Sequence, residues 1–350
     1  MAEAYIQIHK FPQSKSINAV RFLPPLSAFD RPIVAAVHDP DADVFSVEIH
    51  ALEPQNPPNL HLQSSWPTPS RISSLRVSQT PQKPIIAAST LGGTLHLFSA
   101  HPVEASIESE VLLADRSFHS GPISGIDLQG TGTELVSVGE DGRVNLVRVG
   151  ESGLSSNRFF DSRGLVSYKA ARWASPSEFA TGGLGFSLQW WDQRKPGGPV
   201  SQLKGDWARG GKSGMVHSID IHPSRKHVCM AGGSSGTVFA WDLRWQQQPV
   251  LLSGAGPDET IQPLSVSEVW EVQYDSYIQS SNPVSAASAK ILPVMVCLED
   301  GILAVLKQGE EPLELLAEPC AINCFDIDQQ NPSDVICGLE WEAIAILKRP

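Results

Sequence analysis

Three residue types that can form a hydrolytic triad occur within one short stretch of the chain. His119, Ser137 and Asp141 could supply a general base, a nucleophilic hydroxyl and an orienting carboxylate. Such a triad is defined by the distances between its side chains and not by order along the chain. The spacing alone therefore does not predict a hydrolase.

Candidate metal ligands are present, but each group of them is incomplete. The acidic run at 39–43 begins like a calcium-binding loop, which needs Gly at its sixth position and Glu at its twelfth. Val44 and His50 stand there instead, so we predict a polar turn between strands. Cys320 and Cys324 are four residues apart, without the second close pair that is typical of structural zinc sites. We therefore predict no metal site.

A complete phosphate-binding loop for a nucleotide is also lacking. Gly211, Lys212 and Ser213 resemble the end of such a loop, but Asp206 stands where the motif needs its first Gly. The residues that follow predict a strand, whereas the motif opens a helix. We accordingly predict no catalytic residue, no cofactor and no small-molecule substrate.

The charge balance argues against nucleic acid and membranes as direct partners. The 350 residues include 26 Lys and Arg against 38 Asp and Glu, a formal net charge of −12, and the basic residues form no run. Phosphate binding needs clustered basic residues, and no stretch approaches the ~20 apolar residues of a membrane helix. The N-terminal residues do not resemble a secretory signal. The five cysteines fall mostly in apolar runs, which is typical of an intracellular protein.

One unit repeats about seven times along the chain: an apolar strand, a turn rich in Gly or Asp, and a second apolar strand. The clearest copy covers residues 214–244, where MVHSIDIHP, HVCMAGG and TVFAWDLR follow one another. A fixed period of this kind is typical of propeller blades, which bury their faces against neighbouring blades. Further short apolar runs, as at 60–63 and 111–113, complete four strands per blade. The sequence thus predicts an all-β, seven-bladed propeller forming a single domain over residues 1–350.

The two ends of the chain are predicted to share the seventh blade. The last unit ends at Pro350 without room for a fourth strand, whereas residues 5–10 alternate between apolar and polar as a strand does. We predict that this N-terminal strand completes the blade and closes the ring, which removes an exposed sheet edge. A stretch rich in Ser and Ala at 276–290 predicts a loop insertion in the sixth blade.

Trp-Asp pairs at the ends of third strands resemble those of the WD40 family. In that family a His, a Ser or Thr, an Asp and the Trp form a hydrogen-bonded set in each blade. Val147 replaces the Trp in the third blade, while Gly185 and Ser235 replace the Asp in the fourth and fifth. The resemblance therefore implies an atypical WD40-type propeller, held mainly by apolar packing. It assigns structural roles to His119, Ser137, Asp141, Thr181, Trp191, Asp192, Trp241 and Asp242.

Several aromatic and apolar residues are candidates for contacts with other proteins. Trp190 neighbours Trp191, so it should point to the opposite face of its strand. Trp207 and Trp245 fall in predicted linkers, and exposed aromatic residues are enriched at protein interfaces. The alternative is that each tryptophan packs over a neighbouring blade. The candidate interface residues are Trp190, Trp207, Trp245, Tyr277 and Ile278.

Three stretches narrow the resemblance to a family of small WD40 nucleoporins, the nucleoporin forty-three family of the Y-shaped outer-ring scaffold. They are GGLGFSLQWWDQR at 182–194, SEVWEVQYD at 267–275 and VICGLEWEAIAILKR at 335–349. The resemblance implies a non-catalytic structural subunit of the nuclear pore complex at the nuclear envelope. Its partners would be other nucleoporins, and it would support protein transport and mRNA export indirectly.

A second interpretation rests on two Trp-Asp-x-Arg endings, at 191–194 and 241–244. They resemble the endings found in WD40 substrate receptors of cullin-four ubiquitin ligases, which would make a ligase adaptor the partner. The motif is short, and its Arg could instead cap a strand. Replacement of Arg194 and Arg244 by Ala should abolish adaptor binding if this interpretation holds.

Overall fold

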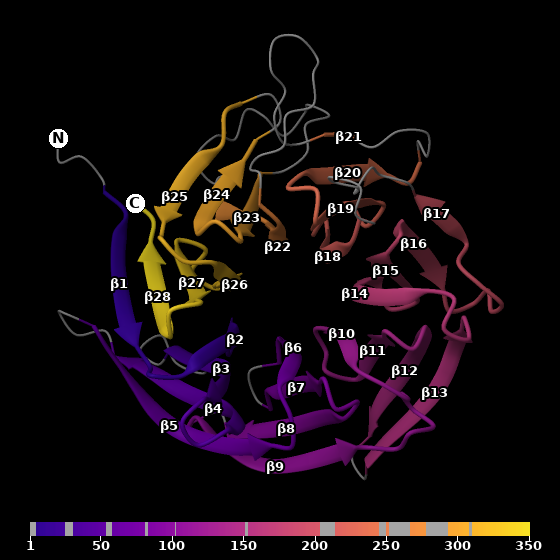
Figure 1. Cartoon of the computed structure of the whole chain (residues 1–350), viewed down its shortest axis with the longest axis horizontal. Helices are drawn as coiled ribbons and strands as arrows, with labels where there is room; N and C mark the ends of the chain where they lie inside the picture. Colours follow the sequence, from indigo (N-terminus) through magenta and orange to yellow (C-terminus); the bar gives the residue numbers. More distant parts are fainter. Residues whose placement is uncertain are drawn as a thin grey trace.

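The fold is a closed ring of antiparallel sheets. The computed structural model describes residues 5–24, 31–53, 58–80, 83–101, 103–150, 153–203, 214–244, 250–251, 267–277, 293–307 and 310–350. Within these residues the strands form seven four-stranded sheets. Figure 1 shows them as blades around a central axis, with the chain passing once around the ring. The prediction of an all-β, seven-bladed propeller is confirmed, and no described helix could cross a membrane.

Strands run from the centre outward in chain order, except that the seventh blade takes its outermost strand from the N-terminus. Blades one to three contain β2 (Ser16–Phe22), β3 (Arg31–Asp39), β4 (Val44–Glu53) and β5 (Asn59–Thr68); β6 (Ile72–Val77), β7 (Ile85–Thr90), β8 (Leu95–His101) and β9 (Ser106–Leu113); and β10 (Ile123–Leu128), β11 (Glu134–Gly139), β12 (Arg143–Gly150) and β13 (Gly153–Asp161). Blades four and five contain β14 (Ser167–Ser175), β15 (Glu178–Leu184), β16 (Phe186–Asp192) and β17 (Ser201–Leu203); and β18 (Val216–Ile221), β19 (Val228–Gly233), β20 (Val238–Asp242) and β21 (Val250–Leu251). Blades six and seven contain β22 (Val269–Tyr274), β23 (Val294–Leu298), β24 (Ile302–Leu306) and β25 (Leu313–Ala317); and β26 (Ile322–Ile327), β27 (Asp334–Leu339), β28 (Ala343–Lys348) and β1 (Gln7–Pro12).

Ring closure follows the prediction from the sequence. β1 pairs with β28 in antiparallel register, from Gln7 opposite Lys348 to Pro12 opposite Ala343. The seventh sheet therefore has the order β1-β28-β27-β26, and strands from both ends of the chain lie side by side in it (Figure 1). The sixth-blade insertion predicted at 276–290 falls almost wholly outside the described residues.

The apolar core consists of seven clusters, each shared by two adjacent blades. Successive residues of a strand point to opposite faces of the sheet, and in a ring a neighbouring blade covers each face. Trp191 is fully buried between blades three and four, where it packs with Val136 of β11. Close packing also requires Gly232, because a Cβ atom there would lie 2.6 Å from the side chain of Val269 in the next blade.

Every innermost strand contains a β-bulge at the same position. The register with the second strand of the blade slips by one residue just after the first buried apolar position. Such a bulge inserts one extra residue and redirects its side chain. We call these seven extra residues the bulge ring; they are Asn18, Ser73, Ser124, Lys169, His217, Trp270 and Asn323.

Candidate functional site

His119, Ser137 and Asp141 meet in the third blade and form a buried network. His119 Nδ1 donates to Asp141 Oδ1 at 3.0 Å, and Ser137 Oγ donates to His119 Nε2 at 2.8 Å. Asn145 Nδ2 donates to the carbonyl of Phe118 at 2.9 Å and lies 2.9 Å from the same Nε2. The exposed fractions of His119 and Ser137 are 2% and 0%, so a substrate cannot reach the hydroxyl. The contacts instead join the segment before β10 to β11 and β12.

The network changes the acidity of Asp141. Burial raises the pKa of the carboxyl, but hydrogen bonds outweigh this effect and lower that pKa to about 2. The donors are the His119 side chain and the backbone N–H groups of Ser120 and Arg143. Asp141 therefore stabilises the third blade in its ionised form.

Another buried carboxylate forms a comparable network in the first blade. Glu48 of β4 accepts from Lys15 Nζ at 2.6 Å and from His50 Nε2 at 3.1 Å. Burial raises the pKa of Glu48, while the bonds from His50 and Lys15 outweigh it and lower that pKa to about 2. The WD40 resemblance did not assign these residues a role, because they lie outside the pattern of that family.

Both networks predict a loss of stability in acid. A carboxyl whose folded pKa is depressed stabilises the fold above its ordinary pKa and loses that contribution as pH falls toward 2. We expect Asp141→Asn to lower the free energy of unfolding by roughly 1.5–3 kcal/mol at pH 7. The difference from the wild type should shrink between pH 4 and pH 2, as measured by urea unfolding. Asp41→Asn in an exposed turn is the matched control, and an Asp141→Asn difference that is the same at pH 3 and pH 7 would contradict the assignment.

The fourth blade keeps another part of the WD40 hydrogen-bonded set. Trp191 Nε1 donates to Thr181 Oγ1 at 2.8 Å, and both residues are fully buried. In the fifth blade Trp241 is 2% exposed and packs in the cluster between blades four and five, where its ring lies 6.0 Å from that of Phe239. Both tryptophans thus lie in the interior, where they fill space between adjacent blades.

The two Trp-Asp-x-Arg endings have the same local structure. Asp192 Oδ1 accepts from the backbone N–H of Arg194 at 3.0 Å and from its Nε at 2.8 Å. Asp242 binds Arg244 in the same way, with both distances 3.0 Å. Each Arg therefore closes a turn at the end of a third strand, as the strand-capping interpretation predicts.

The interface prediction for Trp190 is wrong, because the side chain is only 5% exposed. Trp190 does point away from Trp191, into the cluster that contains Leu203 of the same blade and Ile219 of the fifth. Alternation along the strand predicts opposite faces but not exposure, since both faces of an inner strand are covered by blades. Trp190 therefore packs over a neighbouring blade, which is the alternative to an interface role given above.

Tyr277 lies next to the C-terminal residues. Its hydroxyl donates to the carbonyl of Pro350, and the guanidinium carbon of Arg349 lies 4.4 Å from the centre of its ring. Arg349 also forms a buried two-point ion pair with Asp275, at 2.5 and 3.1 Å. The sixth and seventh blades are thereby joined where the chain ends. The other interface candidates, Trp207, Trp245 and Ile278, lie outside the described residues.

The incomplete metal-ligand groups do not converge in the described part of the chain. Asp39 Oδ1 accepts from the backbone N–H groups of Asp41 and Ala42, both at 3.1 Å, in a polar turn after β3. All five cysteines are buried and free, and burial raises the pKa of the Cys324 thiol to about 12. No group of three or more His, Cys, Asp or Glu side chains among the described residues could hold a metal ion.

A ring of mostly charged residues surrounds the central channel, three positions after each bulge residue. Part of the ring alternates between positive and negative side chains. Arg172 lies between two aspartates, with its NH1 3.2 Å from Asp127 and its Nε 2.9 Å from Asp220. Glu271 neutralises Arg21 at 2.6 Å and lies 3.6 Å from Arg76. We call these seven residues the charged ring; they are Arg21, Arg76, Asp127, Arg172, Asp220, Gln273 and Asp326.

The three aspartates of the charged ring also bind the backbone of the following blade. Asp127 Oδ2 accepts from the N–H of Trp173 at 2.7 Å. Asp220 and Asp326 accept from Tyr274 and Phe22 at 2.8 and 2.9 Å. The last of these bonds crosses the point of ring closure. The backbone groups concerned face the channel, so the carboxylates satisfy donors that no strand can reach.

Sequence reasoning missed both rings, although a signal for them is present. When the innermost strands are aligned, each reads as a buried apolar residue, the bulge residue, one further residue and a second apolar residue, as in INAV, ISGI and VHSI. Six of the seven aligned bulge positions hold a polar or charged residue, and Trp270 is the exception. The alternation of apolar and polar residues within one strand does not reveal the bulge position, because a bulge breaks the two-residue period.

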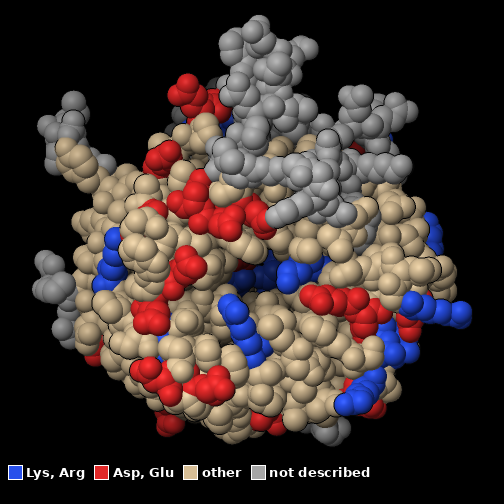
Figure 2. Space-filling model, in the orientation of Figure 1, with Lys and Arg blue, Asp and Glu red and all other residues tan. Residues whose placement is uncertain are grey.

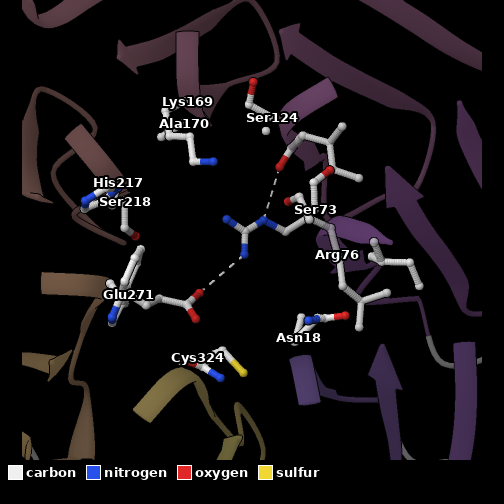
Figure 3. A pocket seen from close by; sticks show the side chains of 18 of the residues that line it. Asn18, Ser73, Arg76, Ser124, Lys169, Ala170, His217, Ser218, Glu271 and Cys324 are labelled. Atoms are coloured by element: carbon white, nitrogen blue, oxygen red, sulfur yellow. Dashed lines mark hydrogen bonds and ion pairs between the residues drawn. The ribbon is translucent and has the colours of Figure 1, made fainter. Parts of the chain in front are cut away.

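A cavity of about 450 Å³ occupies the channel at the level of the bulge ring. Figure 3 shows Lys169 entering it from one side and Arg76 reaching across from β6 toward Glu271. Figure 2 shows basic side chains at the mouth of the channel and acidic side chains on the surrounding surface, most densely over β23, β24 and β27. We call this surface the channel face.

A closed ring of seven blades with remnants of the WD40 hydrogen-bonded set defines a WD40-type propeller protein. No family model matches the chain. It is 55% identical over 365 aligned positions to nuclear pore complex protein NUP43 of Arabidopsis thaliana, covering 100% of this chain and 99% of that protein. The chain therefore belongs to the Nup43 family of nucleoporins.

More distant relatives agree with this family. Nucleoporin Nup43 of Homo sapiens is 29% identical over 229 positions, which cover 63% of this chain and 53% of the human protein. Nuclear pore complex protein nup43 of Dictyostelium discoideum is 27% identical over 213 positions, covering 59% and 43%. The resemblance seen in the sequence is confirmed, and none of these relatives supports the ubiquitin-ligase interpretation.

Proposed function

We propose that the protein is a non-catalytic structural subunit of the Y-shaped outer-ring scaffold of the nuclear pore complex. The observation that carries the proposal is the 55% identity to a plant NUP43 over the full length of both chains. A closed propeller suits this role, because its blades bury one another and leave two rigid faces for other proteins. The protein then acts at the nuclear envelope, binds other nucleoporins and supports protein transport and mRNA export indirectly.

The absence of catalysis is part of this proposal. Its support is the burial of Ser137 and His119, whose geometry resembles a triad but whose hydroxyl no substrate can reach. The channel charges are engaged mainly with one another. We propose no cofactor, no small-molecule substrate and no direct contact with nucleic acid or membrane.

Tagged protein expressed in Arabidopsis cells tests the proposal. We expect a continuous signal at the nuclear rim, together with stoichiometric recovery of outer-ring nucleoporins. Diffuse fluorescence without a rim, and a ligase adaptor as the dominant partner, would overturn it. The double variant Arg194→Ala, Arg244→Ala should leave nucleoporin recovery unchanged, because both side chains bind their own Asp.

Among the described residues, an aromatic side chain on the channel face is strongly exposed and available to such a partner. Trp341 lies in the turn between β27 and β28 and is 65% exposed. The neighbouring Glu340 donates its backbone N–H to Ala321, just before β26, which places the turn on the channel face. Tryptophan is enriched among the residues that dominate binding energy. We propose that Trp341 contacts a nucleoporin directly, in addition to Tyr277, Trp207, Trp245 and Ile278.

Replacement of Trp341 by Ala should weaken recovery of the direct partner by at least ~10-fold, which is the loss expected when a dominant interface residue is truncated. The free energy of unfolding should change by less than about 0.5 kcal/mol, because the side chain is largely exposed. Leu165→Ala, at a position 88% exposed in another blade, is the matched control. Unchanged partner recovery with Trp341→Ala would remove this residue from the interface.

A further inference from the structure

We propose that the cavity at the bulge ring binds a carboxylate side chain from a segment of a partner protein in which one or two acidic residues stand between basic ones. The inference goes beyond the proposed scaffold role, because it assigns a ligand class to the channel and can be tested on the purified protein. It rests on the shape of the cavity, on the charges that line it and on the charges that surround it.

The bulges create the cavity lining. Each adds one residue to an innermost strand and turns that side chain toward the channel, so all seven blades contribute to one site. Asn18 and Asn323 bring side-chain amides that can bond to a peptide backbone. A volume of about 450 Å³ lies within the range of ordinary ligand pockets and accommodates one or two side chains.

The charge of the lining is positive, in contrast with the protein as a whole. Four cationic side chains line the cavity, and Glu271 is the carboxylate among the lining residues. Arg21 and Arg76 lie at the base and share that carboxylate, at 2.6 and 3.6 Å. Burial and then the charge of Arg21 lower the pKa of Arg76, which is the expected effect of two guanidinium groups close together.

The other two cations lie nearer the mouth. Among the described residues, no carboxylate lies within salt-bridge distance of Arg71 or Lys169. Arg71 lies instead beside the Asn18 amide, whose oxygen accepts from Nε and NH2 at 3.0 and 2.9 Å when the amide is oriented to satisfy its hydrogen bonds. Lys169 extends into the cavity (Figure 3). An incoming carboxylate could therefore pair with Arg71 and Lys169 without first breaking an existing ion pair.

The surrounding surface decides the kind of ligand. The channel face is acidic over the sixth and seventh blades (Figure 2), where Glu268, Glu299, Asp300 and Glu340 lie in segments next to the innermost strands. A nucleic acid or an anionic membrane would place many phosphates against these carboxylates, at a cost in energy. A peptide with one or two acidic residues between basic ones avoids that repulsion and complements both regions.

The test measures binding of a fluorescently labelled peptide, Lys-Lys-Ser-Glu-Glu-Ser-Lys-Lys, to the purified protein. The control is the same peptide with both Glu residues replaced by Gln. Fluorescence anisotropy should show saturable binding of the Glu peptide and binding at least ~10-fold weaker for the Gln peptide. Binding should weaken as salt rises. Inorganic phosphate as competitor distinguishes a peptide site from a general anion site, because only the latter is emptied at millimolar phosphate.

The double variant Arg71→Glu, Lys169→Glu should lose binding of the Glu peptide. Arg148→Glu, Lys348→Glu makes the same change in net charge on the outside of the ring and should bind normally. If the channel variant unfolds, Arg71→Gln, Lys169→Gln replaces it. Equal binding of the two peptides, no saturable binding, or unchanged binding by the folded channel variants would overturn the proposal. Nucleoporin recovery is measured in a separate experiment. If the wild-type protein localises to the pore but does not bind the Glu peptide, only the proposed ligand is rejected and the scaffold role stands.

Discussion

Removal of residues 1–12 is expected to open the ring and to make the protein aggregate. The deletion takes away β1, which pairs with β28 over six residue pairs, and the ion pair of Lys10 with Glu318 at 2.7 Å. β28 then becomes an edge strand whose sequence AIAILK is almost entirely apolar. Exposed apolar edges of this kind pair with other chains. We expect a large decrease in the unfolding temperature and high-molecular-weight species in size-exclusion chromatography.

Two controls make this experiment specific. Deletion of residues 1–4 removes part of the N-terminus but leaves β1 intact, and it should behave as the wild type. A synthetic peptide of residues 5–15, added in excess during refolding, should restore the monomer by supplying the missing strand. A truncated protein that is monomeric and as stable as the wild type without this peptide would show that ring closure contributes little to stability.

Asp127→Ala is expected to be the most damaging single substitution in the charged ring. Asp127 as a whole is 3% exposed, and its carboxylate accepts the backbone N–H of Trp173 and lies 3.2 and 3.3 Å from Arg172 and Arg76. The substitution leaves two guanidinium groups and one N–H without this acceptor. Removal of one partner of a buried ion pair typically costs about 3–5 kcal/mol, and we expect a loss of that size in urea unfolding.

Two further variants distinguish charge from hydrogen bonding at this position. Asp127→Asn retains an acceptor for the Trp173 N–H but removes the charge, so its loss of stability should be intermediate. Arg148→Ala breaks a surface pair with a side chain 76% exposed and should cost less than about 1 kcal/mol. Equal stability of Asp127→Ala and Arg148→Ala would mean that the charged ring does not hold adjacent blades together.

The number of blades and the closure of the ring could be predicted from the sequence because both depend on the order of apolar runs. The period of strand, turn and strand gives the count, and the lone strand at 5–10 can pair only where a strand is missing. Outer strands were underestimated. The run at 60–63 belongs to β5, which has ten residues, since one face of an outer strand is exposed and its polar residues conceal its length.

The candidate sites were less predictable, for a geometric reason. The network of His119, Ser137 and Asp141 could be assigned through the WD40 pattern, which fixes all three positions. The burial of Trp190 could not be predicted in this way. Alternation along a strand predicts which face a side chain is on, but only the packing of the blades shows that this face is covered. The bulge ring requires seven strands to be aligned with one another, and no single strand reveals it.

The hydrogen bonds that aspartates of the charged ring accept from backbone N–H groups of the next blade have a mechanical consequence. They join three pairs of innermost strands side chain to backbone, so a force that spreads the blades must break these bonds at the hub first. When the assembly around the ring is stretched, we therefore expect the hub to resist separation of blades three and four, five and six, and seven and one.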